Sequence, residues 1–259
     1  MSSYLDFYSF QKAPFDARPG RGPVLATRAL RAGLAWVGEH IDADHTILCV
    51  SGVDGIGRSS LARVLPGRLA SFCRVARLVD PQRSWPEQRV ILADQLYLDQ
   101  AITPSALVGA RSQGDRIVVV VDAAERADFV FLKHLDELLD MRGPARERLV
   151  QAVLLARDPR PGQEPLWNWL DDRRALIHEL DRISPTEIIG YIRKRIETAG
   201  RRPGDLFTDS AALVVHRHSE GVPRRINLVC DVVLEEGARR GARRIDAHLV
   251  DQTMGSLGR

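Results

Sequence analysis

The sequence predicts an α/β fold, a parallel sheet with helices between its strands, followed by a smaller all-helical domain. The first two thirds of the chain contain short apolar runs at residues 46–50, 74–79, 116–122 and 151–156, with a fifth candidate at 174–180. Within each run the apolar residues are continuous rather than alternating with polar ones. Such runs are typical of parallel strands buried on both faces. Helical patterns lie between them, which predicts a doubly wound sheet with right-handed crossovers.

After residue 183 only helical patterns follow, so we expect domains at 1–183 and 184–259. The first helix of the second domain is predicted to begin with Ser184 as N-cap, Pro185 at the first helical position and Glu187 completing a capping box. Three more helices are expected within 207–221, 221–241 and 245–254, and Asp246 caps the last of these.

The composition is that of an ordinary globular protein. The net charge of +3 permits an acidic partner without requiring one. Cys49, Cys73 and Cys230 are widely spaced and form no C-x-x-C pair, which predicts buried thiols in a reducing compartment. The N-terminus does not resemble a signal peptide, and no apolar run approaches the roughly 20 residues of a membrane helix. We therefore expect a cytoplasmic protein that meets a membrane only through a partner.

The stretch VSGVDGIGRSS at 50–60 resembles a phosphate-binding loop, G-x-x-x-x-G-K-[S/T]. It follows an apolar strand and precedes a helical stretch, which is the context that the motif requires. Glycines allow successive backbone N–H groups to converge on phosphate oxygens at a helix N-terminus. The predicted nucleotide-binding residues of this loop are Gly52, Val53, Asp54, Gly55, Ile56, Gly57, Arg58, Ser59 and Ser60.

Arg58 stands where this motif has a lysine that reaches the terminal phosphates. Arginine keeps the positive charge, but its planar fork is larger than an ammonium group. Binding can therefore survive the change, while catalysis is sensitive to displacements of about 1 Å. Ser59 has the position and the hydroxyl needed to hold Mg²⁺.

The second motif is RIVVVVDAAERA, a buried strand that ends in an acidic residue in the Walker B arrangement. Asp122 is placed to hold Mg²⁺ through water, so the predicted metal residues are Ser59 and Asp122. Hydrolysing relatives commonly have a glutamate after this aspartate, whereas here Ala123 has no acceptor. Glu125 lies two residues further on, and we do not expect it to substitute. Pro66 is expected to end or kink the helix that follows the loop.

Together these features resemble the AAA+ ATPases of the ExeA type, the general secretion pathway protein A and its pilus-biogenesis relatives. The resemblance runs nearly end to end. The opening YLDFYSFQKAPFDARPG resembles an N-terminal family motif, with Pro14 and Phe15 as its Pro-Phe pair. The segments ISPTEIIGYIRKRIETAG, LFTDSAALVVHRHSEGVPRRINLVCDVVL and RRIDAHLVDQ resemble the family's helical lid, and Arg224 in GVPRRIN matches its sensor-2 arginine.

The resemblance implies a P-loop NTPase core of the AAA+ class with strand order 5-1-4-3-2, a helical lid, and ATP and Mg²⁺ as ligands. Pro14 and Phe15 would join the nucleotide site, and Asp122 and Arg224 would be its catalytic residues. Assembly would be homo-oligomeric, or hetero-oligomeric with a secretion or pilus component. Arg173 and Arg174 are candidates for an arginine finger, although a solvated helix end is the favoured interpretation of either one alone.

The chain also departs from this family. Arg157 and Asp158 stand where the sensor-1 region commonly has a neutral polar residue, and the segment between the second and third strands looks shorter than usual. The membrane span and the peptidoglycan-binding region of longer members are not found. His216 and His218 are interpreted as partly exposed helix residues, while of Trp167 and Trp169 one is expected in the core and the other could anchor a subunit interface.

Three functions remain open on the sequence. The leading hypothesis is an ATP-binding AAA+ module whose hydrolysis is weak or lost, so that nucleotide acts on conformation and assembly. The second is a DNA-associated AAA+ helper of the transposition or replication-initiator type, prompted by the basic segment with Arg239, Arg240, Arg243 and Arg244. Nucleic acid is the less favoured partner. The third is a scaffold that binds no nucleotide.

Overall fold

The computed structural model describes residues 4–16, 24–69, 73–98, 102–111, 116–159, 164–202, 204 and 206–257. Two compact units make up the chain. The sheet unit comprises residues 30–54 and 58–180, and the helical unit comprises 1–29, 55–57 and 181–259. Within the described ranges, no helix has the length and apolar character needed to cross a bilayer.

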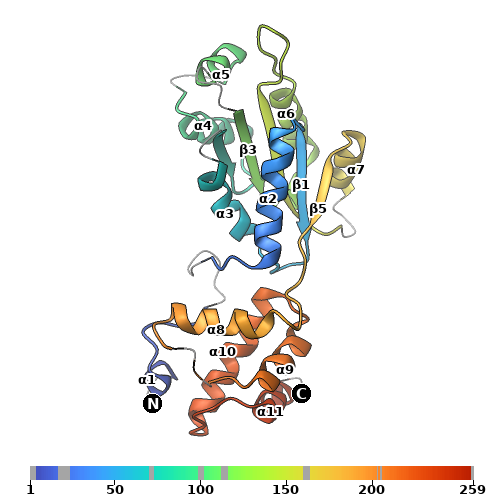
Figure 1. Ribbon diagram of the computed structural model, residues 1–259. Helices are drawn as coiled ribbons and strands as arrows, with labels where there is room; N and C mark the ends of the chain where they lie inside the picture. The colour runs from blue at the N-terminus through green and yellow to red at the C-terminus, as the bar shows by residue number, and fades with distance from the viewer. Residues whose placement is uncertain are drawn as a thin grey trace. The chain divides into compact units, whose positions relative to one another are not determined.

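Among its described residues, the sheet unit contains five parallel strands in the order β2-β3-β4-β1-β5, which confirms the predicted order 5-1-4-3-2 (Figure 1). The strands are β1 Ile47–Gly52, β2 Cys73–Leu78, β3 Arg116–Asp122, β4 Val150–Arg157 and β5 Leu176–Glu179. Every residue of β1 is buried, as are all residues of β3 after the first. This burial explains the continuous apolar runs, because both faces of the sheet are covered by helices.

The register brings three strand ends to one edge of the sheet. Gly52, the last residue of β1, pairs with Arg157 at the end of β4. Asp122, the last residue of β3, pairs with Leu155 of β4. Because ligands of open α/β sheets bind outside the carboxyl ends of the strands, this edge is where a site is expected.

Helices lie on both sides of the sheet (Figure 1). On α2 and α3, Gly33 and Leu61 are so close that a methyl group at residue 33 would lie 2.9 Å from the Leu61 side chain. Elsewhere α6 contacts both α4 and α7: Trp85 of α4 packs edge-on against Phe131, and the Trp169 indole N–H of α7 donates to Asp136. The helices of this unit are α2 Arg28–Asp42, α3 Arg58–Leu69, α4 Trp85–Gln95, α5 Pro104–Ala110, α6 Phe129–Leu139 and α7 Glu164–Asp172, with a 3₁₀ turn, η1, at Ala124–Arg126.

The expectation that Pro66 ends its helix is wrong, because α3 continues through it to Leu69, while the alternative of a kink stays a prediction. Proline removes the N–H that would bond the carbonyl four residues earlier. Here it stands in the last turn, so only a short piece of helix follows it. Leu65 and Leu69, on either side, are buried and hold this end of α3 in the core.

The helical unit contains α1 Tyr4–Tyr8, α8 Ile188–Thr198, α9 Asp209–Ser219, α10 Pro223–Arg239 and α11 Ala247–Leu257. The last three pack against one another, and α8 packs against α9. Asp246 caps α11 as predicted, because its carboxylate accepts a hydrogen bond from the Leu249 N–H at 2.9 Å. The predicted start of α8 is three residues too early, because 185–187 form a turn and the helix begins at Ile188. The Ser184 N–H and hydroxyl nevertheless donate to the Glu187 carboxylate at 3.1 and 2.8 Å, and the Glu187 N–H donates to the Ser184 carbonyl at 3.0 Å.

The N-terminal segment belongs to the helical unit. The Tyr4 hydroxyl donates to Asp231 at 2.5 Å, and the Tyr8 hydroxyl donates to the Ala242 carbonyl at 2.8 Å. Phe15 is fully buried and meets the Phe207 ring edge-on. The expected division at 183 puts this segment with the sheet, whereas the contacts group it with the helices. As a division by function, 1–183 and 184–259 stays a prediction.

Candidate nucleotide site

The phosphate-loop motif spans the turn between β1 and α3. Gly55 and Gly57 have φ of 85° and 125°, in the range that side-chain-bearing residues rarely adopt. Arg58 is the first residue of α3, so the loop leads directly into a helix N-terminus, where backbone N–H groups lack partners within the helix. Loop and helix therefore have the arrangement that suits a bound phosphate.

Ser59 and Asp122 lie together, although they come from α3 and β3. The Ser59 hydroxyl donates to Oδ1 of Asp122 at 3.2 Å, and the Ala123 N–H donates to the same oxygen at 3.0 Å. The other carboxylate oxygen, Oδ2, accepts a hydrogen bond from Arg77 of β2 at 2.7 Å. Asp122 is 6% exposed, so the carboxylate of this charge-assisted pair is largely desolvated.

A second ion-pair cluster holds Arg58. Its guanidinium lies 3.5 Å from Glu125 and 3.8 Å from Asp54. Glu125 is buried and also accepts a hydrogen bond from the Arg157 N–H at 3.1 Å, with the Arg157 guanidinium 3.7 Å away. Burial lowers the pKa of Arg58, and Glu125 and Asp54 oppose that shift. Glu125 is thus engaged by two arginines, in agreement with the expectation that it is not a spare water-orienting acid.

Ala123 adopts a left-handed conformation, with φ 55° and ψ 39°. This region costs a residue with a Cβ roughly 1–2 kcal/mol. The strain lies directly after Asp122, where the chain leaves β3 and enters η1. A methyl group offers a water molecule no hydrogen-bond acceptor at this position.

The remaining predicted site residues belong to the helical unit. Arg224 is in the first turn of α10, and its N–H donates to the Gly55 carbonyl at 3.2 Å. Both residues belong to the helical unit, which includes residues 55–57. Pro14 is buried, and the ring of Phe15 packs in the hydrophobic core of this unit. Their roles toward a nucleotide, like those of the loop residues, stay predictions.

The residues of this candidate site suit a nucleotide better than they suit a magnesium ion. The loop conformation and the start of α3 suit phosphate oxygens. The magnesium pair, Ser59 and Asp122, is assembled, but one carboxylate oxygen of Asp122 already holds a guanidinium at 2.7 Å. A second cation at this carboxylate would be repelled by Arg77. Phosphate binding therefore fits the residues, and a magnesium ion at Asp122 does not.

The other sequence candidates are bonded elsewhere. Arg173 pairs with Asp136 at 2.6 Å, and Trp167 and Trp169 both pack against the sheet unit's core. His216 lies 2.9 Å from the Ile183 carbonyl, and His218 contacts Asp251. Among the described residues, no group of His, Cys, Asp and Glu could hold a metal ion. The three cysteines are buried and free, and burial raises the pKa of Cys49 to about 12.

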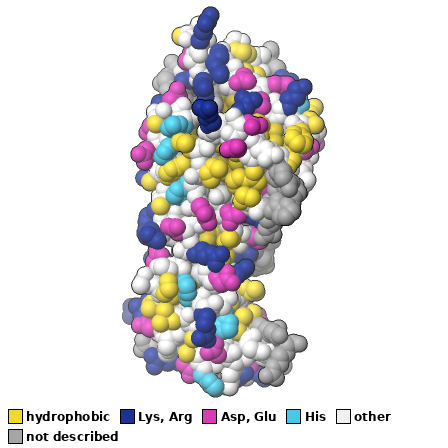
Figure 2. Space-filling model, turned by 90° about the vertical axis from the view of Figure 1, so that its right-hand side faces the viewer, with side chains coloured by type: hydrophobic (Ala, Val, Ile, Leu, Met, Phe, Trp, Pro, Cys, Tyr) yellow, Lys and Arg dark blue, Asp and Glu magenta, His cyan; other side chains and the backbone are white. Residues whose placement is uncertain are grey.

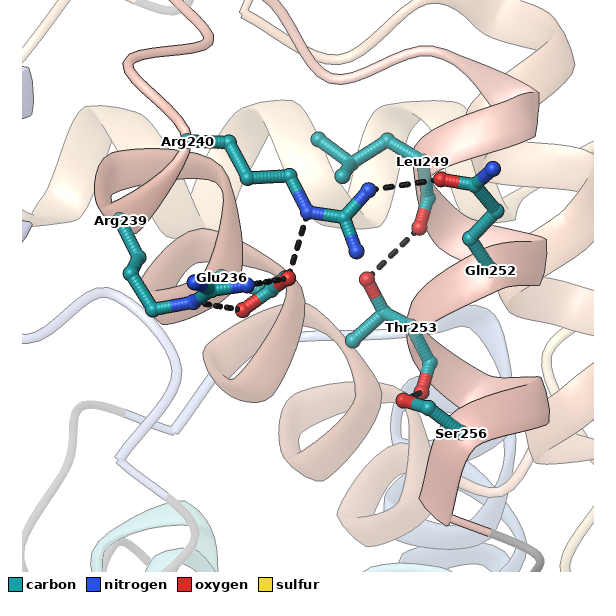
Figure 3. Close-up of polar contacts among 7 residues, drawn as sticks. All are labelled: Glu236, Arg239, Arg240, Leu249, Gln252, Thr253 and Ser256. Atoms are coloured by element: carbon teal, nitrogen blue, oxygen red, sulfur yellow. Dashed lines mark hydrogen bonds and ion pairs between the residues drawn. The ribbon is translucent and has the colours of Figure 1, made fainter.

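In the basic segment at the end of α10, Arg239 and Arg240 share the carboxylate of Glu236 (Figure 3). Glu236 accepts hydrogen bonds from Arg239 at 2.6 and 2.7 Å and from Arg240 at 2.5 Å. Arg240 also donates to Gln252 of α11 at 2.6 Å, and Arg243 lies over the Phe7 ring at 4.6 Å. In the view of Figure 2, basic and acidic side chains are interspersed over the helical unit.

Sequence reasoning missed Arg77. The one signal available was a basic residue next to the end of a strand that is otherwise expected to be buried. Arg77 matters because β2 lies beside β3. It is opposite Val120, which is two residues before Asp122 on β3. A local sequence pattern does not show which strands are neighbours in the sheet.

Comparison with known proteins agrees with this architecture. No protein-family model matches the chain. The chain is 25% identical over 256 residues to general secretion pathway protein A of Aeromonas hydrophila, covering 93% of this chain but only 46% of that protein. It therefore spans about half the length of this relative.

Solved structures show the same fold. The ORC2 protein of Aeropyrum pernix, solved as ADPNP and ADP complexes, aligns over 94% of this chain and 71% of its own, at 13% identity and a TM-score of 0.65. A RuvB mutant of Thermotoga maritima aligns over 90% of this chain and 70% of its own, at 19% identity and a TM-score of 0.55. Together with the strand order, these similarities show that the chain has the AAA+ type of P-loop fold, and that its sequence resembles general secretion pathway protein A over nearly all of its length.

Proposed function

We propose that this chain is an ATP-binding AAA+ module whose hydrolysis is weak or lost, and in which nucleotide acts on conformation and assembly. The proposal rests on one contrast: the phosphate loop suits nucleotide binding, whereas the positions that would orient the attacking water do not suit hydrolysis. The loop and the Ser59–Asp122 pair have the form of a nucleotide site, whereas Ala123 offers no acceptor and Glu125 is held by Arg58 and Arg157.

Binding and hydrolysis make different demands on these residues. Phosphate binding needs backbone N–H groups and positive charge, and both are present at the start of α3. Hydrolysis also needs a group that orients the attacking water. The next carboxylate after Asp122 in the sequence, Glu125, could take that task only by giving up contacts to two arginines, which would leave buried charges unpaired.

Similarity to general secretion pathway protein A supports a place in secretion or pilus assembly, in an oligomer of this chain or with a component of that machinery. A DNA-associated role has less support, because Arg239 and Arg240 donate hydrogen bonds to Glu236 and Gln252. We keep a cytoplasmic location as part of the proposal.

Calorimetry with ATP and a phosphate-release assay test this proposal together. We expect heat of binding without turnover above background. Arg58→Lys combined with Ala123→Glu and Arg77→Gln is expected to bind ATP with Mg²⁺ and to gain turnover, because the three changes return a compact ammonium group, a water-orienting acid and a carboxylate that is free to hold magnesium. Wild-type turnover comparable with ordinary members of the fold, and abolished by Asp122→Ala, would contradict weak hydrolysis.

A further inference from the structure

We propose that this chain binds a nucleoside triphosphate without magnesium, and that the guanidinium of Arg77, supported by Arg58 and Arg157, stands where the ion would be. This inference rests on the proposed nucleotide binding and specifies its chemistry. Arg77 is a specificity-determining residue in this scheme, because it decides whether the site accepts the free or the magnesium-bound nucleotide.

The Arg77–Asp122 pair is the first observation. At 2.7 Å between guanidinium nitrogen and carboxylate oxygen, with side chains 26% and 9% exposed, it is a short and partly desolvated contact. Asp122 is the residue that a magnesium ion would require. Its negative charge is compensated within the protein before any ligand arrives.

The fold holds Arg77 in this place by contacts to its backbone. Its N–H donates to Oε1 of Gln95 at 2.7 Å, and its carbonyl accepts from Nε2 of Gln95 at 3.1 Å. Because β2 is an edge strand, Gln95 supplies the partners that a further strand would otherwise offer. The pairing of β2 with β3 then directs the arginine toward the end of β3.

Charge balance is the second observation. A lysine and a magnesium ion would together bring three positive charges to a triphosphate; Arg58, Arg77 and Arg157 also carry three, which Asp54, Asp122 and Glu125 offset in the protein without ligand. All three lie in the sheet unit and contact the carboxylates of that edge, Asp54, Asp122 and Glu125. The Nε atoms of Arg77 and Arg157 are buried without a hydrogen-bond partner, so neither guanidinium is saturated by protein acceptors in the described part of the chain.

Magnesium would have to compete with this arrangement. The ion would either displace Arg77, leaving a partly buried guanidinium without its carboxylate, or sit beside it and be repelled. Phosphate oxygens face no such conflict, because arginine is well suited to phosphate.

The test is the ATP affinity of the full chain, measured by calorimetry in excess Mg²⁺ and again in EDTA. For the wild type we expect dissociation constants that agree within about threefold. For Arg77→Gln we expect binding in EDTA to weaken by at least roughly tenfold, because Asp122 then repels the phosphates, and to recover when Mg²⁺ is added. Recovery by the metal also shows that the variant is folded.

Two further variants sharpen the test. Asp122→Asn in the Arg77→Gln background removes the uncompensated charge and is expected to restore binding in EDTA. Arg74→Gln, on the same strand, leaves the Arg77–Asp122 pair intact and is the matched control, expected to behave as the wild type.

Three outcomes are decisive. Equal wild-type affinity in both buffers, with magnesium dependence appearing in Arg77→Gln, supports the inference. ATP binding by the wild type only in Mg²⁺ overturns it and leaves the proposed nucleotide binding standing. No heat of binding in either buffer overturns both.

Discussion

Gly237 lies inside α10 at a place where an alanine methyl group has no room. A Cβ there would lie 2.4 Å from the Tyr8 hydroxyl oxygen and 2.7 Å from Cδ1 of Ile245. Both side chains are buried, so neither can turn into solvent. We expect Gly237→Ala to lower the free energy of unfolding by about 1–3 kcal/mol, measured by urea denaturation.

Two companion variants separate this clash from a general effect on helices. A methyl group added at Gly190 in α8 would meet no described atom within 4 Å beyond its own helix, so Gly190→Ala is expected to stabilise by up to about 1 kcal/mol. Tyr8→Phe removes the closest atom, so Gly237→Ala should cost less in that background than in the wild type. Equal costs in both backgrounds would show that the hydroxyl is not the obstacle.

At the scale of elements, the end of α10 is organised around one carboxylate. Hydrogen bonds from Arg239 and Arg240 lower the pKa of Glu236 to about 2, below the value near 4.3 expected in an unfolded chain. A depressed pKa means that the stability from this group is present above about pH 4.5 and is lost as the pH falls toward 2.

We therefore expect Glu236→Gln to have a lower free energy of unfolding than the wild type at neutral pH. This difference in free energy should shrink as the pH falls from about 4.5 toward 2. Because the two arginines are solvent-exposed partners, the effect should stay below about 1 kcal/mol. Urea denaturation at both ends of this range measures it, with Glu39→Gln on the exposed face of α2 as control. A gap that stays constant with pH would contradict the assignment.

Elements were predictable where local pattern decides them. Continuous apolar runs located the strands because burial on both faces imposes them, and Asp246 marked the start of α11. Pro66 misled because tertiary packing of Leu65 and Leu69 outweighs a local helix breaker near a helix end. The start of α8 was predicted three residues too early, because the hydrogen bonds of Ser184 form around a turn that precedes the helix.

At the scale of the molecule, each unit has its own hydrophobic core, and the N-terminal segment contributes to the helical one. Sequence pattern could not reveal this, since contacts such as Tyr4 with Asp231 join residues 227 positions apart. The strand order, in contrast, came from a family resemblance and is confirmed. In the candidate site, motif spacing located Ser59 and Asp122, but Arg77 required the sheet.

Phe15 is fully buried in the helical unit, so Phe15→Ala is expected to destabilise that unit by about 3–5 kcal/mol. The chain's four tryptophans, Trp36, Trp85, Trp167 and Trp169, all lie in the sheet unit. Tryptophan fluorescence therefore follows the sheet unit, whereas circular dichroism also follows the helices. We expect the dichroism transition to move to lower denaturant and the fluorescence transition to move less.

Phe129→Ala is the matched control, because that side chain is 73% exposed on α6 and its loss should change stability by no more than about 0.5 kcal/mol. A dichroism transition unchanged by Phe15→Ala would contradict the assignment of the N-terminal segment to the helical core.

The Arg77–Asp122 pair also has an evolutionary consequence. If an internal cation replaces the metal, then Arg58, Arg77 and Ala123 form one inherited set, and relatives that keep a lysine in the loop and a glutamate after the strand have no use for an arginine at the end of β2. Across a lineage these three positions should change together. Ancestors reconstructed along that lineage should show the arginine of β2 arriving no later than the loss of the water-orienting acid.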